Sequence, residues 1–353
     1  MKRQASLSFM ALLTAALVVP VGAAQAASTA SILFSRTHTA PNGSTYTSLY
    51  RVKPSGQNVV PLTSAEAGTH YQPGSWSPSG SSVVYEHLRD GAPGRSQLFV
   101  VDRQGGSPHR ITSGAYLHQQ PSWGPGGMVA YIADRGNHNL CLAVVHADGQ
   151  GQRDLFCPHI FDRPTEPMTL STPQWTPSGK SVVFEAAAYE DDLDGPWISH
   201  VYRVNVTTAS VVPLTEQDLS EQTALAVAPD TKQGIYAYMH GDDSMYRVNF
   251  ATGTQTQLGI GSSPRYSPDS SKVAFDKGGQ IFVMNADGSN VRAAIANPNP
   301  NAVYSVADWS WNGTRLLVNK VGENQRMQIV DLATGTATTV TDGTAAQDGW
   351  YHL

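Results

Sequence analysis

Histidine and glutamine recur together at two equivalent points of the sequence. His70 and Gln72 stand just before a proline, and so do His118 and Gln120. Imidazole and amide groups can hold a metal or a sugar acid, and histidine is the common acid–base group near neutral pH. The spacing lacks the constraint of a motif such as HExxH, so histidines that occur in loops by chance are the alternative interpretation. Other candidates for the same binding surface are His138, Trp197, His200 and His240.

A carboxylate-rich segment, residues 190–197, supplies a second candidate site. Asp191, Asp192 and Asp194 precede a glycine, which suits Ca²⁺ bound on a loop. The segment lacks the EF-hand spacing and its terminal bidentate glutamate, so a solvated acidic loop is the alternative. We expect no cofactor; if Ca²⁺ or a transition metal binds, the candidate ligands are these aspartates with His70 and His118.

The chain contains 2 cysteines, Cys141 and Cys157. They lie in β-rich runs on either side of a turn at Asp148–Gly149, so a hairpin would place position 141 opposite position 157. A disulfide is the expected state in an exported protein, and two buried thiols are the alternative. The sequence shows no CxxC, GxSxG, GxGxxG or P-loop pattern, which argues against redox, serine hydrolase and nucleotide chemistry.

The N-terminus has the organisation of a secretory signal. Lys2 and Arg3 precede an uncharged apolar run, and Ala24-Gln25-Ala26 has the small–x–small pattern of a signal peptidase site. The apolar run is short for a membrane span and no stop-transfer segment follows it. We expect residues 1–26 to be removed and residues 27–353 to form one domain. The mature chain is then periplasmic, secreted or at the cell surface, without a transmembrane segment.

Composition narrows the class of protein. Of 353 residues, 40 % are hydrophobic and 14 % charged, with 32 glycines and 22 prolines. This excludes a coiled coil and argues against wholesale disorder. The net charge is −5, and the lysines and arginines are scattered along the chain. Neither nucleic acid nor an anionic membrane is therefore an expected partner.

A repeated phrase of the type Pro-x-Trp-x-Pro-x-Gly organises the remaining chain. Its copies recur about every 40 to 50 residues, a period that suits one four-stranded unit. A β-rich run such as Ser82–Glu86 follows each copy, and a second run ends at a glycine-containing turn such as Asn285–Gly288. The copies, the weaker ones included, begin at Pro73, Pro121, Pro173, Leu225, Pro264, Asp308 and Asp348.

This pattern predicts that each unit forms a propeller blade of four antiparallel strands, which we name A to D from the repeated phrase onward. The chain enters its first unit at Ser31, which already belongs to a B strand, and Asp348–Leu353 supplies an unpaired A strand. The two ends should complete one blade and close the ring. We predict an all-β, seven-bladed propeller; six blades is the alternative, if the repeat at residues 224–260 is irregular.

The repeated phrase, the hydrophobic strand after it and the Val/Met-Asn/Asp-x-x-Gly turn resemble the repeat of TolB-type β-propellers. The resemblance is closest from Pro264 to Asn290 and extends over the predicted mature chain. It implies a secreted or periplasmic propeller that binds a partner. The namesake also has an N-terminal α/β domain, for which the few residues from Ala27 to Ser31 leave no room, so the resemblance does not extend to its envelope role.

The sequence therefore predicts a secreted, non-catalytic binding scaffold. Its mouth face, formed by the B–C and D–A connections, would hold a protein, peptide or glycan of the cell envelope or the surroundings, and we expect a monomer. The alternative is a metal-assisted polysaccharide lyase or glycan hydrolase with a histidine-lined channel. Seven-bladed oligogalacturonate lyases, which hold a metal on His and Gln in such a position, motivate that alternative, although their His-rich run is not reproduced here.

Overall fold

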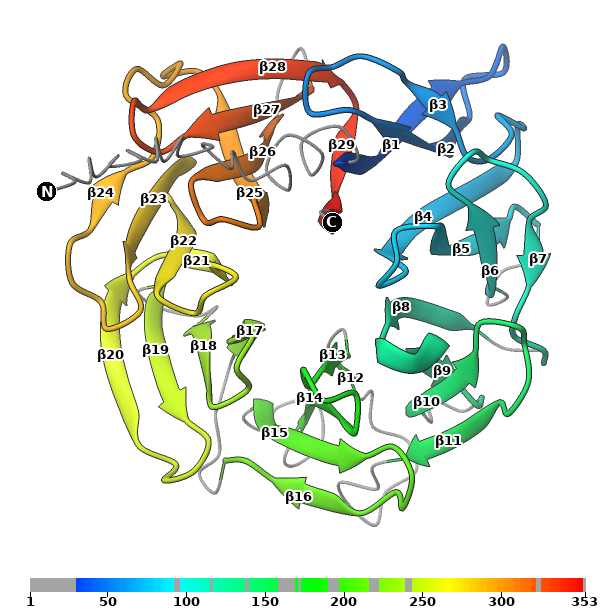
Figure 1. Ribbon diagram of the computed structural model, residues 1–353, viewed down its shortest axis with the longest axis horizontal. Helices are drawn as coiled ribbons and strands as arrows, with labels where there is room; N and C mark the ends of the chain where they lie inside the picture. The colour runs from blue at the N-terminus through cyan, green and yellow to red at the C-terminus, as the bar shows by residue number, and fades with distance from the viewer. Residues whose placement is uncertain are drawn as a thin grey trace, which may run out of the picture.

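Short runs of β-branched and aromatic residues, separated by Gly, Pro, Asp and Ser, fold as antiparallel strands joined by tight turns. The computed structural model describes residues 30–91, 96–114, 117–136, 140–157, 169–170, 173–189, 197–215, 222–238, 243–321 and 325–351. Their strands form seven sheets arranged in a ring, so the chain is a seven-bladed β-propeller (Figure 1). The segment 224–260 contributes a regular four-stranded sheet, which confirms seven blades over six.

Each blade has the predicted A–B–C–D order from the centre outward (Figure 1). The innermost A strands are β4 (Thr69–Trp76), β8 (His118–Trp123), β12 (Thr169–Leu170) with β13 (Gln174–Trp175), β17 (Gln222–Val227), β21 (Ser262–Tyr266), β25 (Val303–Trp309) and β29 (Thr344–Tyr351). The B strands are β1 (Ser31–Thr39), β5 (Ser82–Arg89), β9 (Met128–Asp134), β14 (Ser181–Tyr189), β18 (Gln233–Tyr238), β22 (Lys272–Lys277) and β26 (Arg315–Val321).

The two outer positions of each blade complete the sheets. The C strands are β2 (Thr45–Val52), β6 (Ser96–Asp102), β10 (Leu140–His146), β15 (Trp197–Asn205), β19 (Ser244–Asn249), β23 (Gln280–Asn285) and β27 (Arg326–Asp331). The D strands are β3 (Val60–Pro61), β7 (His109–Arg110), β11 (Arg153–Phe156), β16 (Val211–Pro213), β20 (Gln255–Ile260), β24 (Arg292–Ala293) and β28 (Thr336–Asp342). We number the blades in chain order, with blade 1 formed by β29-β1-β2-β3 and blade 7 by β25-β26-β27-β28.

The ring closes as predicted. Strand β29, from the C-terminal end, pairs with β1 from the N-terminal end through Ser31 opposite Tyr351 and Ile32 opposite Trp350. Figure 1 shows β29, in red, beside the dark blue β1 at the inner edge of blade 1. The hydrophobic core is divided among the blade interfaces, because each main cluster of buried side chains joins two neighbouring blades.

The tryptophan of the repeated phrase connects neighbouring blades by a hydrogen bond as well as by packing. The Nε1–H of Trp76 in blade 2 donates to the carbonyl oxygen of Gly349 in blade 1 at 3.0 Å. Trp175 in blade 4 donates to Ser122 in blade 3, and Trp309 in blade 7 donates to Arg265 in blade 6, both at 3.0 Å. The tryptophan of the repeated phrase therefore lies at a blade interface wherever these bonds form.

The two cysteines form the predicted disulfide. Cys141 in β10 is fully buried, and its Cα lies 4.2 Å from the Cα of Cys157, just beyond β11. A register shift places Ala143 opposite Asp154 and not opposite position 155, and the bridge forms across this irregular hairpin.

Within the described residues, no helix is long and apolar enough to cross a membrane.

Candidate ligand-binding groove between blades 7 and 1

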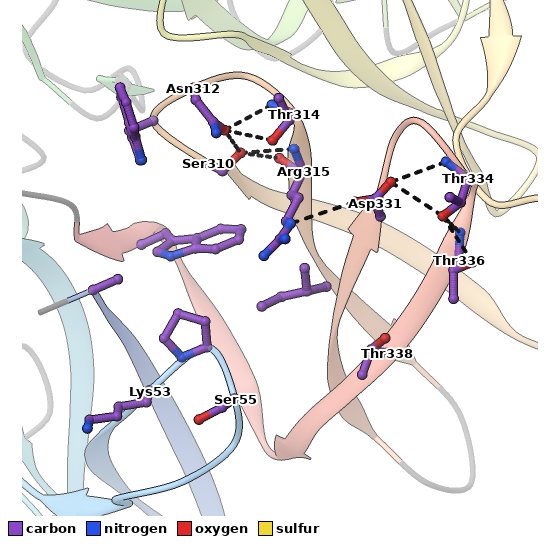
Figure 2. A pocket seen from close by; sticks show the side chains of 15 residues that line it. Lys53, Ser55, Ser310, Asn312, Thr314, Arg315, Asp331, Thr334, Thr336 and Thr338 are labelled. Carbon is purple, nitrogen blue, oxygen red and sulfur yellow. Dashed lines mark hydrogen bonds and ion pairs between the residues drawn. The ribbon is translucent and has the colours of Figure 1, made fainter. Parts of the chain in front are cut away.

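A groove of about 850 Å³ lies where blades 7 and 1 meet, on the face that carries the A–B and C–D turns (Figure 2). Its volume is within the range typical of ligand sites, whereas a second cavity, near the inner strands of blades 4 to 6, measures about 170 Å³. The groove is lined by Ala30, Lys53, Pro54, Ser55, Ser310, Trp311, Asn312, Thr314, Arg315, Ile329, Asp331, Thr334, Thr336, Thr338 and Trp350.

One wall of the groove is the A–B turn of blade 7. Ser310 Oγ accepts the amide of Arg315 at 2.9 Å, and Asn312 Oδ1 accepts the amide of Thr314 at 3.2 Å. These bonds fix the turn locally, and the side chain at its corner is left free to project. That side chain is Trp311, which is 57 % exposed. An exposed tryptophan held on a rigid turn is a favourable contact for a ligand because little side-chain entropy is lost on binding.

The opposite wall is the C–D turn of blade 1, residues 53–57. Gly56 closes this turn, with its amide donating to the carbonyl oxygen of Lys53 at 2.8 Å and its φ at 78°. A Cβ at Gly56 would lie 2.5 Å from the carbonyl oxygen of Val340 in β28. Glycine is therefore required here for two reasons: the backbone is in the left-handed conformation, and blade 7 leaves no space for a side chain. Lys53 and Ser55 on this turn lie across the groove from Asn312 on the A–B turn of blade 7 (Figure 2).

The charges of the groove are unequal. Asp331 Oδ1 accepts the amides of Ala333 and Thr334, and the Thr334 amide bond is the leading cause that lowers the pKa of this carboxyl from its ordinary value. Its other oxygen lies 3.8 Å from Arg315 Nε, a loose ion pair. Lys53 Nζ makes no hydrogen bond or ion pair with the residues that the structure describes. Two cations thus face one carboxylate that the turn already holds.

A second set of polar groups lies on the B strands, beside the inner strands. Glu86 of blade 2 accepts the amide of Gln120 of blade 3 at 2.6 Å, and Asp276 of blade 6 accepts that of Val306 of blade 7 at 3.2 Å. Asn319 of blade 7 accepts the amide of Ala345 of blade 1 at 2.8 Å. These amides lie at or next to irregularities of the inner strands, where bulges disrupt the ladder. The side chains therefore hold neighbouring blades together.

The pKa values of the two carboxyls of this set, Glu86 and Asp276, are raised. Burial raises the pKa of Glu86 to about 7, against the opposing effect of the Gln120 amide. Burial likewise raises the pKa of Asp276 to about 6, against hydrogen bonds from Val306 and Ser263 and the charge of Arg265. In the folded state both groups keep a proton at pH values where the unfolded chain has lost it. They therefore make the fold less stable as the pH rises from the unfolded pKa toward the folded one.

The variant Glu86→Gln should flatten this dependence. Gln keeps an oxygen to accept the Gln120 amide but cannot ionise. The wild type should lose stability between pH 4.5 and 7, and the variant should not lose this part. We therefore expect the difference in free energy of unfolding, variant minus wild type, to increase by on the order of 2 kcal/mol over this range. Urea denaturation at pH 5 and pH 8 measures this difference. Glu66→Gln, at an exposed position, is the matched control, and parallel pH profiles for wild type and Glu86→Gln would contradict the assignment.

The predicted histidines and glutamines of blades 2 and 3 lie in different environments. His70 lies in β4 with Nε2 3.1 Å from Asp90 Oδ1, and Gln72 is exposed opposite Glu86. His118 is fully buried in β8, where Nδ1 lies 3.3 Å from the Ser96 carbonyl. Burial is the leading cause that lowers its pKa. Gln120 is partly buried with φ at 53°, and its backbone amide donates a hydrogen bond to Glu86 of blade 2.

Some of the remaining sequence-predicted residues lie within the described ranges, and the others lie outside them. His200 lies in β15, partly buried, with its ring 6.2 Å from that of Tyr202, so it too belongs to a strand and not to a connection. Trp197 begins the same strand, and its side chain lies outside the described part. Cys141, Cys157 and Asp154 form the one group of three candidate metal ligands within the described residues, and its two sulfurs are in the disulfide. Residues outside the described ranges are His138, His240, Asp191, Asp192 and Asp194.

Sequence reasoning missed the groove, although one signal for it was present. In the clear copies of the repeated phrase the residue two after the tryptophan is proline, as at Pro78 and Pro177. In blade 7 this residue is Trp311. A large aromatic in place of a turn-forming proline has no role in the turn itself, which favours a contact outside the fold. Lys53 and Arg315 carried no comparable signal, because only the ring closure brings them together.

Known structures share the propeller. No protein-family model matches the sequence. TolB from Acinetobacter baumannii is 14 % identical with a TM-score of 0.50, over 91 % of this chain and 82 % of that one. Oligogalacturonate lyase in complex with manganese is 13 % identical with a TM-score of 0.65, over 88 % and 85 %.

A third similar structure has a different ring closure. The β-propeller domain of the Trilobed protease from Pyrococcus furiosus is 11 % identical with a TM-score of 0.62, over 88 % of this chain and 95 % of that one. Its ring is described as an open velcro, whereas β29 and β1 close the ring here. At such identities these likenesses show the fold alone. The chain shares the β-propeller fold of TolB proteins, as its repeated phrase indicated.

Proposed function

We propose that this protein is a binding propeller that works outside the cytoplasm and holds its ligand in the groove between blades 7 and 1. The observation that carries the proposal is Trp311, 57 % exposed at the corner of a hydrogen-bonded turn. Its ring borders a groove large enough for a ligand of several rings. A rigid scaffold with an aromatic anchor and a polar surround is the usual composition of a recognition site. The partner is a component of the cell envelope or of the surroundings.

The proposed location rests on two features. The first 26 residues have the pattern of a secretory signal, and the chain is a propeller with a disulfide, a bond that persists in oxidising compartments. We propose cleavage after Ala26 and a free or envelope-associated mature chain. N-terminal sequencing of exported protein tests this, since an intact Met1 on the exported chain would contradict it.

The variant Trp311→Ala should lose most of the binding while it keeps its stability. We expect retention of the purified mature protein on isolated cell envelopes to fall about 10- to 100-fold, the range of a central aromatic contact. Co-sedimentation with a concentration series of envelopes measures it. The lining residues offer Asp331 as their one carboxylate, so chelation with EDTA should leave the binding unchanged.

The matched control is Val212→Ala, which shortens another exposed apolar side chain on β16 of blade 4, outside the groove lining. This variant should bind like the wild type. Equal retention of wild type and Trp311→Ala would refute the groove as the binding site and would favour the mouth face. Comparable melting curves for all three proteins are needed to ascribe the loss to the contact.

A further inference from the structure

The groove between blades 7 and 1 offers hydrogen-bond donors in excess of acceptors. Lys53 Nζ, Trp311 Nε1 and the hydroxyl of Thr338 make no hydrogen bond within the described part of the chain. Among the described residues, the Arg315 side chain makes one polar interaction, from Nε to Asp331 at 3.8 Å, so its two terminal nitrogens are available to a ligand. The single carboxylate of the lining is held by the Ala333 and Thr334 amides of its own turn. Such a site is satisfied by a ligand rich in acceptors.

Charge points to the same kind of ligand. Lys53 and Arg315 face one carboxylate in the groove, although the chain as a whole carries a net charge of −5. A locally positive groove on an acidic protein attracts anions there and repels them elsewhere. The guanidinium of Arg315 can bind a carboxylate or a phosphate through two parallel hydrogen bonds, and Lys53 can add a point charge.

The shape of the lining separates a sugar chain from a small anion. Pro54, Trp311 and Ile329 contribute apolar side chains to the lining. Thr336 and Thr338, two apart on β28, present hydroxyls along one side (Figure 2). A free anion would leave the apolar surface without a partner in a groove of about 850 Å³. A sugar ring has an apolar carbon face, which packs on an indole, and a rim of hydroxyls, which can bond threonine and serine.

We propose that the groove binds an anionic glycan: a sugar or polyol chain that carries carboxylates or phosphodiesters. This rests on the proposed function and names the ligand class of the same groove. The anionic groups contact Arg315 and Lys53, and a sugar ring stacks on Trp311. Specificity comes from the pairing of charge with a stacked ring, so neither a neutral glycan nor a free anion satisfies both parts.

Calorimetric titration of the purified mature protein tests the proposal with defined probes. These are a uronic-acid oligosaccharide, the same oligosaccharide with its carboxyls reduced to alcohols, a polyol-phosphate oligomer and an oligoglutamate peptide. We expect at least one anionic glycan to bind at least 10-fold more tightly than the reduced oligosaccharide and the peptide. The two anionic glycans distinguish a carboxylate ligand from a phosphodiester ligand.

The double variant Lys53→Gln/Arg315→Gln should weaken binding of the anionic glycan at least 10-fold and reduce its salt dependence. The double variant Arg110→Gln/Arg292→Gln, at exposed positions on β7 of blade 2 and β24 of blade 6, removes the same number of positive charges outside the groove and should bind normally. Three results would overturn the inference: equal binding of the acidic and the reduced oligosaccharide, tighter binding of the peptide, or no binding of any glycan. The proposed function is judged separately, by the retention of Trp311→Ala on envelopes, and survives each of these results.

Discussion

Removal of residues 344–353 is expected to abolish the cooperative unfolding transition of the protein. Strand β29 is the inner strand of blade 1, so its loss leaves β1 with an unpaired inner edge. It also removes Trp350 and Tyr351, both buried in the clusters that join blade 1 to its neighbours. Hydrogen bonds from other blades lose their partners as well, among them those between Asn319 and Ala345, Trp76 and Gly349, and Asp308 and Trp350.

Circular dichroism and differential scanning calorimetry measure this outcome. We expect the truncated protein to show no sharp melting transition, or to aggregate through its exposed edge. A chain that lacks only residues 352–353 keeps the whole of β29 and is the control. An unchanged melting curve for the long truncation would show that the ring does not depend on this closing strand. Addition of a synthetic peptide of residues 344–353 should restore part of the transition if the closure is as observed.

The variant Trp76→Ala is expected to destabilise the fold by about 3–5 kcal/mol. The Trp76 side chain is 6 % exposed and packs in the cluster between blades 1 and 2, with its ring 5.6 Å from that of Tyr351. Its removal leaves a cavity at the blade interface and deprives the Gly349 carbonyl of its donor at 3.0 Å. Urea denaturation followed by circular dichroism gives the free energy of unfolding.

The variant Trp76→Phe separates the two contributions. Phenylalanine keeps much of the ring and loses the indole N–H, so we expect a smaller loss, on the order of 1–2 kcal/mol for the hydrogen bond plus some packing. Trp311→Ala is the control for a tryptophan on an exposed turn, where truncation should cost little stability. Equal stability of Trp76→Ala and wild type would mean that the interface does not depend on this residue.

The position of the groove relates binding to ring closure. Trp350 and Ala30 line the groove, and both lie at the seam where β29 pairs with β1. A ligand that bridges the turns of blades 7 and 1 binds the closed ring in preference to an opened one, and so stabilises it. The melting temperature should therefore rise with ligand concentration, which offers a simple screen for the glycans proposed above.

Sequence alone determined the blade and its order, because these depend on local patterns. Pro-Ser-Gly or Pro-Asp turns, β-branched runs and glycine-containing hairpins each favour their structure within a few residues, and their period marks one unit. The missing A strand before Ser31 and the surplus one at Asp348 were enough to predict closure, which the pairing of β1 with β29 confirms. The hairpin turn at Asp148–Gly149 likewise indicated that Cys141 and Cys157 lie close together, and the disulfide confirms it.

The tertiary structure decided which side chains meet between blades. Sequence shows His118 as a polar residue before an inner strand, yet packing against Ser96 and Tyr131 buries it completely. Lys53 and Arg315 lie far apart along the chain and become neighbours in one groove only when the ring closes. Contacts within a blade follow from local periodicity, whereas contacts between blades depend on the position of every blade in the ring. For that reason the fold could be predicted from the sequence and the candidate site could not.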